Sequence, residues 1–281
     1  MKVEITKSCF LFILLLFLPF LAWSEHMDGK TKDTIYFYNP ETNINNFVSL
    51  KISFDTYLSK FGNYRFQPFD KKELFEAALF EGNHGIYLLS SWHYQSLRDE
   101  IDLHPLLVGV FNGQSTQKKI LTVKRNITDV MLLKGKTIAS SGNEQYTINL
   151  LNEMIGDENQ GILQTVKLIL VPKDIDALMA VGFGMAAAAI TSERSFENLR
   201  KINPKQHQRL RPLMESQQHY LALAALPAKA NMDAATLLDI LEKMGINAEG
   251  EIRLRMLGID GWRRLSKQEQ LLLKQKEHKG L

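Results

Sequence analysis

Polar side chains gather in four short stretches of the sequence, each at or soon after the end of a run of β-forming residues. Hydroxyl, phenol and amide groups at such positions could hold a small polar or anionic solute through hydrogen bonds. Ser, Thr and Asn are also preferred at helix N-caps and turns, so a structural role remains the alternative for each of them. We expect the stretch Ser140–Thr147 to act as a unit. The candidate ligand-binding residues are Tyr38, Asn39, Ser90, Ser91, Tyr94, Ser140, Ser141, Asn143, Tyr146, Thr147, Thr191 and Ser192.

Sequence motifs of nucleotide binding and hydrolysis are absent from the chain. It contains no G-x-x-x-x-G-K-[ST] loop, no G-x-S-x-G elbow and no H-E-x-x-H motif. Gly182-Phe-Gly184 lacks the third glycine of a dinucleotide fingerprint, so we interpret these glycines as packing or turn positions. Asp99-Glu100 and the pair Asp174/Asp176 stand at predicted helix starts, where negative charge favours the helix dipole. We therefore predict no catalytic residue, no cofactor and no enzymatic activity.

Three histidines, His84, His93 and His104, lie close together in the sequence. Histidine is a common ligand for copper and zinc, so metal binding by this group is an alternative. Their spacings match no compact metal motif, and we interpret them as surface or loop histidines. No metal site is predicted.

The first 24 residues have the pattern of a secretory signal peptide. Lys2 and Lys7 precede or flank an apolar run over 9–23, and small residues at Ala22 and Ser24 favour cleavage before Glu25. The alternative is an uncleaved membrane anchor, but the run is shorter than the roughly 20 residues that a spanning helix needs. Cleavage would remove the only cysteine and leave a mature chain without thiols or disulfides. The Gram-negative periplasm is the predicted location.

The charge balance gives no support for nucleic-acid binding. The chain of 281 residues has 34 Lys and Arg against 31 Asp and Glu, a net charge of +3. Nucleic-acid-binding domains usually show a much stronger positive excess. No second stretch is apolar enough to span a membrane, because charged residues interrupt the nearest one, over 161–185. We expect a monomer whose partners are a small-molecule ligand and a membrane protein.

Strand-like and helix-like patterns alternate along most of the chain. Period-two and period-3.6 apolar spacing predicts a β-α-β-α-β unit over 34–89 and a second, smaller one over 126–200. Such an order implies mostly parallel sheets flanked by helices. The absence of a Pro/Gly-rich linker suggests two lobes joined by hinge strands. The predicted organisation is signal peptide 1–24, disordered segment 25–33, lobe 1 over 34–124 and 213–265, lobe 2 over 125–212, and a charged C-terminal helix or tail 266–281.

Six segments resemble, in order, one known family of binding proteins. One of them is Leu133–Ala139 (LKGKTIA), which is similar to the family's entry into its second lobe. Together the segments resemble the phosphate/phosphite/phosphonate-binding periplasmic proteins of ABC transporters. The other segments are Thr34–Pro40, Ala77–Ile86, Asp176–Ala189, Leu210–Ser216 and Leu257–Arg263.

This resemblance implies a type 2 periplasmic-binding-protein-like α/β fold whose two lobes close over a phosphate- or phosphonate-like ligand. It also implies delivery of that ligand to an ABC permease. The loop after 139 has only part of the family's hydroxyl-rich run, and Glu144 would repel a dianion if it faced the cleft. Three alternatives remain open: a soluble receptor that feeds a membrane sensor, a His-based metal-binding variant, and an enzyme built on the same fold.

Overall fold

The computed structural model describes residues 33–42, 44, 46–82, 85–156, 159–230 and 234–275. The predicted signal peptide, nearly all of the segment 25–33, His84 and the end of the charged tail lie outside these residues. Asp33 already belongs to the first strand, so regular structure begins one residue earlier than expected. Among the helices of the described ranges, none combines the length and apolar character needed to cross a membrane.

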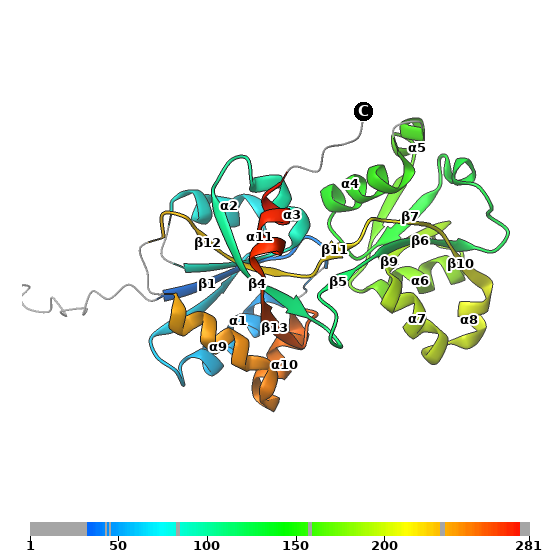
Figure 1. Cartoon of the computed structure of the whole chain (residues 1–281). Coiled ribbons are helices and arrows are strands. Elements are labelled where there is room, and N and C mark those ends of the chain that lie inside the picture. Colours follow the sequence, from blue (N-terminus) through cyan, green and yellow to red (C-terminus); the bar gives the residue numbers. More distant parts are fainter. Residues whose placement is uncertain are drawn as a thin grey trace, which may run out of the picture. The chain divides into compact units, whose positions relative to one another are not determined.

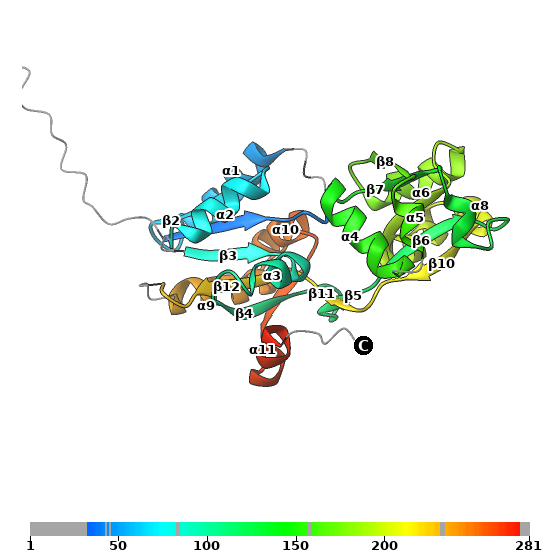
Figure 2. The ribbon, with the colours of Figure 1, turned by 90° about the horizontal axis from the view of Figure 1, so that it is seen from above.

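The first sheet has six strands in the order β13-β4-β12-β3-β1-β2 (Figure 2). Strands β2, β1 and β3 are parallel and come from the predicted first β-α-β-α-β unit. Asn46 caps the first helix by accepting a hydrogen bond from the Ser49 amide. The elements of this unit are β1 (Asp33–Tyr38), α1 (Phe47–Leu58), β2 (Tyr64–Pro68), α2 (Lys72–Phe80) and β3 (Gly85–Leu89).

The other half of the first sheet is antiparallel. Strand β12 lies between β3 and β4, antiparallel to both, and β13 pairs with the outer edge of β4. The sheet is therefore mixed: β4 follows α3 and runs in the direction of β3, whereas β12 and β13 run the opposite way. The elements are α3 (Ser91–Leu97), β4 (Leu103–Val110), β12 (Leu223–Pro227), α9 (Ala235–Lys243), η3 (Met244–Ile246), α10 (Ala248–Met256), β13 (Gly261–Arg264) and α11 (Lys267–Lys274).

The second sheet has five strands in the order β10-β6-β9-β7-β8, and it is also mixed. Strands β9, β7 and β8 are parallel, whereas β6 and β10 run antiparallel to their neighbours. Strand β6 pairs here although the sequence placed it with the first lobe. The elements are β6 (Lys119–Lys124), η1 (Val130–Leu133), β7 (Thr137–Ser140), α4 (Glu144–Ile155), α5 (Gln160–Leu163), β8 (Lys167–Leu170), α6 (Asp174–Phe183), β9 (Ala188–Ser192), α7 (Glu193–Ile202), α8 (Pro204–Arg209) and β10 (Leu210–Glu215).

The chain passes twice between the two sheets. The first passage contains β5 (Thr116–Gln117) and the second contains β11 (His219–Tyr220), and these short strands pair antiparallel with each other (Figure 1). The sequence predicted one continuous strand over 219–226. Residues Leu221 and Ala222 interrupt it, because the chain leaves the two-stranded ladder there and enters the first sheet.

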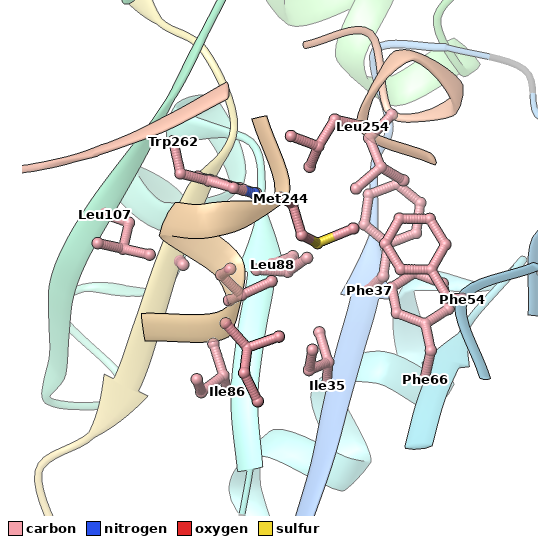
Figure 3. Packing of buried hydrophobic residues seen from close by; sticks show 14 of the residues in the cluster. Ile35, Phe37, Phe54, Phe66, Ile86, Leu88, Leu107, Met244, Leu254 and Trp262 are labelled. Carbon is pink, nitrogen blue, oxygen red and sulfur yellow. The ribbon is translucent and has the colours of Figure 1, made fainter. Parts of the chain in front are cut away.

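Helices cover both faces of the first sheet. Alternate side chains of β1 and β3 point to opposite faces. Phe37 and Leu88 pack with α1, α9 and α10 (Figure 3). Tyr36 and Tyr87 pack with α2, α3 and α11 on the other face. The rings of Phe54 and Phe66 stack with centroids 4.2 Å apart in the first of these clusters. The second sheet has the same sandwich of α4 and α5 on one face and α6 and α7 on the other.

The first residue of β3 is Gly85, and the neighbouring strand β1 lies too close to it for a side chain. A Cβ placed there would lie 2.4 Å from the carbonyl oxygen of Thr34 and 2.6 Å from the ring of Tyr36. Parallel pairing of β3 with β1 therefore requires glycine at this position.

Candidate ligand-binding site

A cavity of about 480 Å³ lies among residues that follow the strands of both sheets. Its polar part comes from the loop after β1, the end of β3, the start of β6 and the loops at the ends of β7 and β9. The segment after α10 supplies an apolar wall that includes Leu257 and Ile259. Carboxyl ends of parallel strands are the usual ligand sites of α/β folds, so this position fits a binding function.

Glu41 reaches from the loop after β1 into a polar cluster with residues of the second sheet. Its side chain is buried, at 7 % exposure, and accepts a hydrogen bond from Nε2 of Gln117 at 2.9 Å. The Lys119 ammonium lies 3.6 Å from the same carboxylate oxygen. Burial raises the pKa of Tyr146 well above its usual value, and the charges of Glu41 and Asp174 raise it further. The Tyr146 hydroxyl, which is hydrogen-bonded to Glu41, therefore stays protonated.

Asp174 is held by donors from two other segments. Ser141 Oγ donates to Oδ1 at 2.6 Å, while the backbone N–H and Oγ of Ser192 both donate to Oδ2 at 2.8 Å. We call these three donors the hydroxyl cradle. Burial alone would raise the pKa of Asp174, but the charge of Lys119 and the cradle bonds outweigh burial and hold that pKa below its usual value. Asp174 lies in the first turn of α6, where the sequence predicted a negative charge that favours the helix dipole, and its carboxylate also bonds these donors outside the helix.

Arg194 provides a second cation beside the cavity. Its guanidinium carbon lies 3.7 Å from the ring centroid of Phe111, a cation–π contact that joins the start of α7 to the end of β4. Burial lowers the pKa of Arg194, and the nearby Asp174 and Asp260 partly oppose this. The side chain remains charged at neutral pH. Lys173 and Arg255 also line the cavity.

Four of the sequence-predicted residues line this main cavity: Asn39, Ser90, Ser141 and Ser192. Two more, Tyr38 and Asn143, line a neighbouring cavity of about 230 Å³ that Asn39 also borders. Asn143 Nδ2 donates to the Tyr38 hydroxyl at 2.9 Å. Burial raises the pKa of Tyr38 to about 12, so this hydroxyl is neutral at physiological pH.

The remaining predicted residues make internal contacts. Thr147 Oγ1 donates to Ser140 Oγ at 2.9 Å, and Ser91 Oγ donates to the carbonyl of Tyr220 at 2.7 Å. The Tyr94 hydroxyl donates to a backbone carbonyl within the core of the first sheet. Thr191 is fully buried within β9, which runs two residues further than predicted, and its Oγ1 has no hydrogen-bond partner among the described residues.

Sequence reasoning missed the charged members of the site: Glu41, Lys119, Asp174 and Arg194. A signal was available for two of them, because Lys119 opens a mostly apolar strand and Arg194 comes just after the end of another. Nothing in the sequence indicates that Asp174 would meet Ser141 and Ser192, since that contact depends on how β7 and β9 pair.

Of the three grouped histidines, the structure describes His93 and His104, and each contacts a different carboxylate. His93 is fully buried, and its Nε2 lies 2.9 Å from a carboxylate oxygen of Glu76. Burial lowers the pKa of His93, and the bond to Glu76 partly opposes the shift. His104 is exposed, with Nε2 3.4 Å from Asp102. Within the described ranges, no three His, Cys, Asp or Glu side chains are arranged to hold a metal ion.

Several solved structures share this architecture at low sequence identity. A binding-protein component of an ABC phosphonate transporter from Pseudomonas aeruginosa matches with a TM-score of 0.63 and 14% identity, covering 87% of this chain and 85% of that one. PhnD1 from Prochlorococcus marinus in complex with methylphosphonate matches with a TM-score of 0.59 and 11% identity over 86% of this chain and 96% of that one. A Xanthomonas citri protein bound to ATP matches with a TM-score of 0.59 and 15% identity over 86% and 96% of the two chains.

These likenesses establish the fold as that of type 2 periplasmic binding proteins, with two mixed sheets flanked by helices. No curated protein sequence matches the chain. A family model described as the phosphonate periplasmic substrate-binding protein of ABC transporters matches residues 55–270, which is most of the sequence. The chain therefore belongs to the family of periplasmic substrate-binding proteins of phosphonate ABC transporters, a non-catalytic family.

Proposed function

We propose that this protein captures a small polar or anionic solute in the main cavity and delivers it to the permease of an ABC transporter. Family membership supports the transport role. The Prochlorococcus protein was solved with methylphosphonate bound, which makes phosphate- and phosphonate-like solutes the first class to consider. The predicted signal peptide would bring the mature chain to the periplasm, where such receptors work.

The observation that carries the proposal is the position of Lys119. The residue is only 6 % exposed, and its ammonium group lies at the cavity beside Glu41. Taking an ammonium group out of water is costly unless negative groups surround it. Glu41 and Asp174 partly meet this cost, but Arg194, Lys173 and Arg255 add further positive charge around the same cavity. The balance favours a ligand with an anionic group.

Contacts between the loops of the two sheets support closure around a ligand. The amide N–H of Asn143, which follows β7, donates to the carbonyl of Pro40, which follows β1, at 2.8 Å. Two-lobed receptors close by hinge motion, and the closed form is the one that a membrane partner recognises. We assign lobe 1 to the six-stranded sheet, lobe 2 to the five-stranded sheet from β6 to β10, and the hinge to the β5–β11 ladder.

Thermal-shift screening of protein that has been unfolded, dialysed and refolded tests this function. The panel would contain phosphate, phosphite, alkylphosphonates, sulfonates, carboxylates and divalent metals. A true ligand raises the melting temperature as its concentration exceeds Kd. Calorimetry would then compare Lys119→Met, which keeps the apolar stem, with Lys118→Met, whose exposed ammonium pairs with Glu215.

We expect Lys119→Met to lose at least about tenfold in affinity for an anionic ligand, because hydrogen bonds to charged groups contribute roughly 1.5–3 kcal/mol. Lys118→Met should bind as the unaltered protein does. A panel in which only zinc or copper raised the melting temperature would replace this proposal with a metal-binding function. Equal loss in both lysine variants would exclude the main cavity as the site.

A further inference from the structure

Three donors converge on one carboxylate in the wall of the main cavity. Ser141 Oγ bonds one oxygen of Asp174, and the N–H and Oγ of Ser192 bond the other, at 2.6, 2.8 and 2.8 Å. Hydroxyl and backbone N–H donors at strand ends are the groups that proteins use to bind free oxyanions. Ser141, Asp174 and Ser192 all line the cavity. An internal carboxylate therefore already satisfies donors of the kind that an incoming oxyanion needs.

The helix dipole alone does not explain why the Asp174 carboxylate reaches the hydroxyl cradle. Asp174 is the first residue of α6, where negative charge is favourable, but both of its carboxylate oxygens bond donors outside the helix, whereas Asp176 in the same turn is exposed. The three donors come from two segments, the loop after β7 and the end of β9, which meet because these two strands are neighbours. The cradle is thus a property of the tertiary fold, and Asp174 occupies it.

A second carboxylate, that of Glu41, adds negative charge beside Lys119. Glu41 lies 3.6 Å from the Lys119 ammonium, the same cation whose charge acts on Asp174. A ligand that approached Lys119 would therefore meet two negative side chains beside that cation, although Lys173, Arg194 and Arg255 also line the cavity. Each additional negative charge on the ligand adds repulsion from both carboxylates.

We infer that Asp174 is a specificity-determining residue: it fills the hydroxyl cradle and makes the cavity favour singly charged or zwitterionic solutes over dianions such as a fully ionised phosphonate. This inference rests on the proposed function for its physiological meaning. Asp174 and a ligand oxyanion would compete for the same three hydrogen-bond donors. Removing the Asp174 side chain should release those donors to the ligand.

Methylphosphonate and methanesulfonate provide a matched pair of probes. The two have similar size and shape, but at about pH 9 the phosphonate carries two negative charges and the sulfonate one. Titration calorimetry would measure both probes with the ligand-stripped protein, with Asp174→Ala and with Asp176→Ala as the control on the same turn of α6. Melting temperatures would verify that each variant refolds.

We expect Asp174→Ala to bind methylphosphonate at least about tenfold more tightly than the unaltered protein, since hydrogen bonds to a charged group are individually worth about that much. Asp176→Ala should not change the affinity. Adding Ser141→Ala to Asp174→Ala should remove part of the gain, because one cradle donor is lost. Should Asp174→Ala refold poorly, Asp174→Asn serves instead, with the methylphosphonate-to-methanesulfonate affinity ratio as the readout.

Two results would overturn the inference. One is tight binding of methylphosphonate by the unaltered protein that weakens in Asp174→Ala, which would make Asp174 a supporting residue of a dianion site. The other is no gain in methylphosphonate affinity or affinity ratio in any refolded Asp174 variant. Failure of the proposed function has a different signature, because no solute of the panel would then bind the unaltered protein, whatever the Asp174 variants do.

Discussion

The side chain of Asn143 donates through Nδ2 to the hydroxyl of Tyr38 at 2.9 Å, and so connects the loop after β7 with the end of β1. These two residues stand 105 positions apart in the sequence: Tyr38 ends a strand of the first sheet, and Asn143 follows a strand of the second. Asn143 also caps α4 by accepting from the Tyr146 amide. One side chain thus fixes a helix start and a contact between the two sheets.

Tyr38→Phe tests the energy of this contact. The change keeps the buried ring and removes the acceptor, so we expect a loss of about 1 kcal/mol in the free energy of unfolding. Urea denaturation provides the measurement. Tyr64→Phe, at a partly exposed ring on the edge strand β2, is the control and should change stability by less than about 0.5 kcal/mol. Equal effects in the two variants would show that the Asn143 contact adds no stability.

Gly85→Ala tests the close approach of β3 to β1. The new Cβ would lie 2.4 Å from a backbone oxygen that cannot move without disturbing the sheet, so we expect about 3 kcal/mol of destabilisation. Gly161→Ala in α5 is the matched control, because no heavy atom lies within 4 Å of the added Cβ. That control should be neutral or stabilising by up to about 1 kcal/mol. A mild effect of Gly85→Ala in urea denaturation would contradict so close an approach of the two strands.

Glu41→Gln tests the electrostatic balance of the main cavity. Glutamine keeps an acceptor for Gln117 and Tyr146 but removes a negative charge 3.6 Å from Lys119. We expect anionic ligands to bind at least about tenfold more tightly, with a smaller gain at high salt. Calorimetry at two salt concentrations measures both effects.

Glu144→Gln is the control for that experiment. Glu144 begins α4 and is exposed outside the main cavity, so its removal should leave anion affinity within about twofold of the unaltered protein. The sequence suggested repulsion of a dianion if Glu144 faced the cleft. A gain from Glu144→Gln as large as that from Glu41→Gln would mean that distant charge, not the local cluster, sets affinity.

The ion pair between Glu269 of α11 and Arg263 of β13 holds the last described helix against the first sheet, and its strength depends on pH. Hydrogen bonds from Arg263, followed by those from the backbone and side chain of Ser266, lower the pKa of Glu269 from 4.5 to about 2. Because the folded-state pKa is the lower one, the stabilisation is complete above about pH 4.5 and is lost as the pH falls toward 2. The group is partly exposed, so screening limits the contribution to roughly 1–2 kcal/mol.

Melting temperatures of the unaltered protein and Glu269→Gln between pH 7 and the acid range check this expectation. Glutamine retains an acceptor for the capping box with Ser266 but cannot ionise. The advantage of the unaltered protein should therefore shrink below about pH 4.5 and vanish near pH 2. A difference that stayed constant over this range would assign the effect to packing of α11.

Much of the fold could be predicted from local pattern. Strands β2 and β3 and helix α6 have the predicted ends, because glycine, proline and a change of apolar period mark each boundary. The segment 201–218 was described from the sequence only as polar, and no helix was predicted there, yet it contains α8 and β10. Asn203-Pro204 carries a helix-start signal, with Asn203 as the cap. Strand β10 is only partly buried at the edge of its sheet and so lacks strong apolar alternation.

The site was predictable in position but not in charge. Polar residues after parallel strands must meet at one edge of a sheet, which is why Ser141 and Ser192 both reach the main cavity. Partnerships such as Asp174 with Ser192, or Glu41 with Lys119, depend on three-dimensional proximity of segments that no local pattern relates. Internal pairing also accounts for Ser140 and Thr147, which bond each other within the predicted loop.

The position of β12 constrains the order in which a growing or translocating chain can fold. This strand fills the middle of the first sheet, between β3 and β4, although it is made after every strand of the second sheet. Until it arrives, the facing edges of β3 and β4 have no partner and are exposed to aggregation or chaperones. The half of the molecule that is synthesised first must therefore be the last to mature.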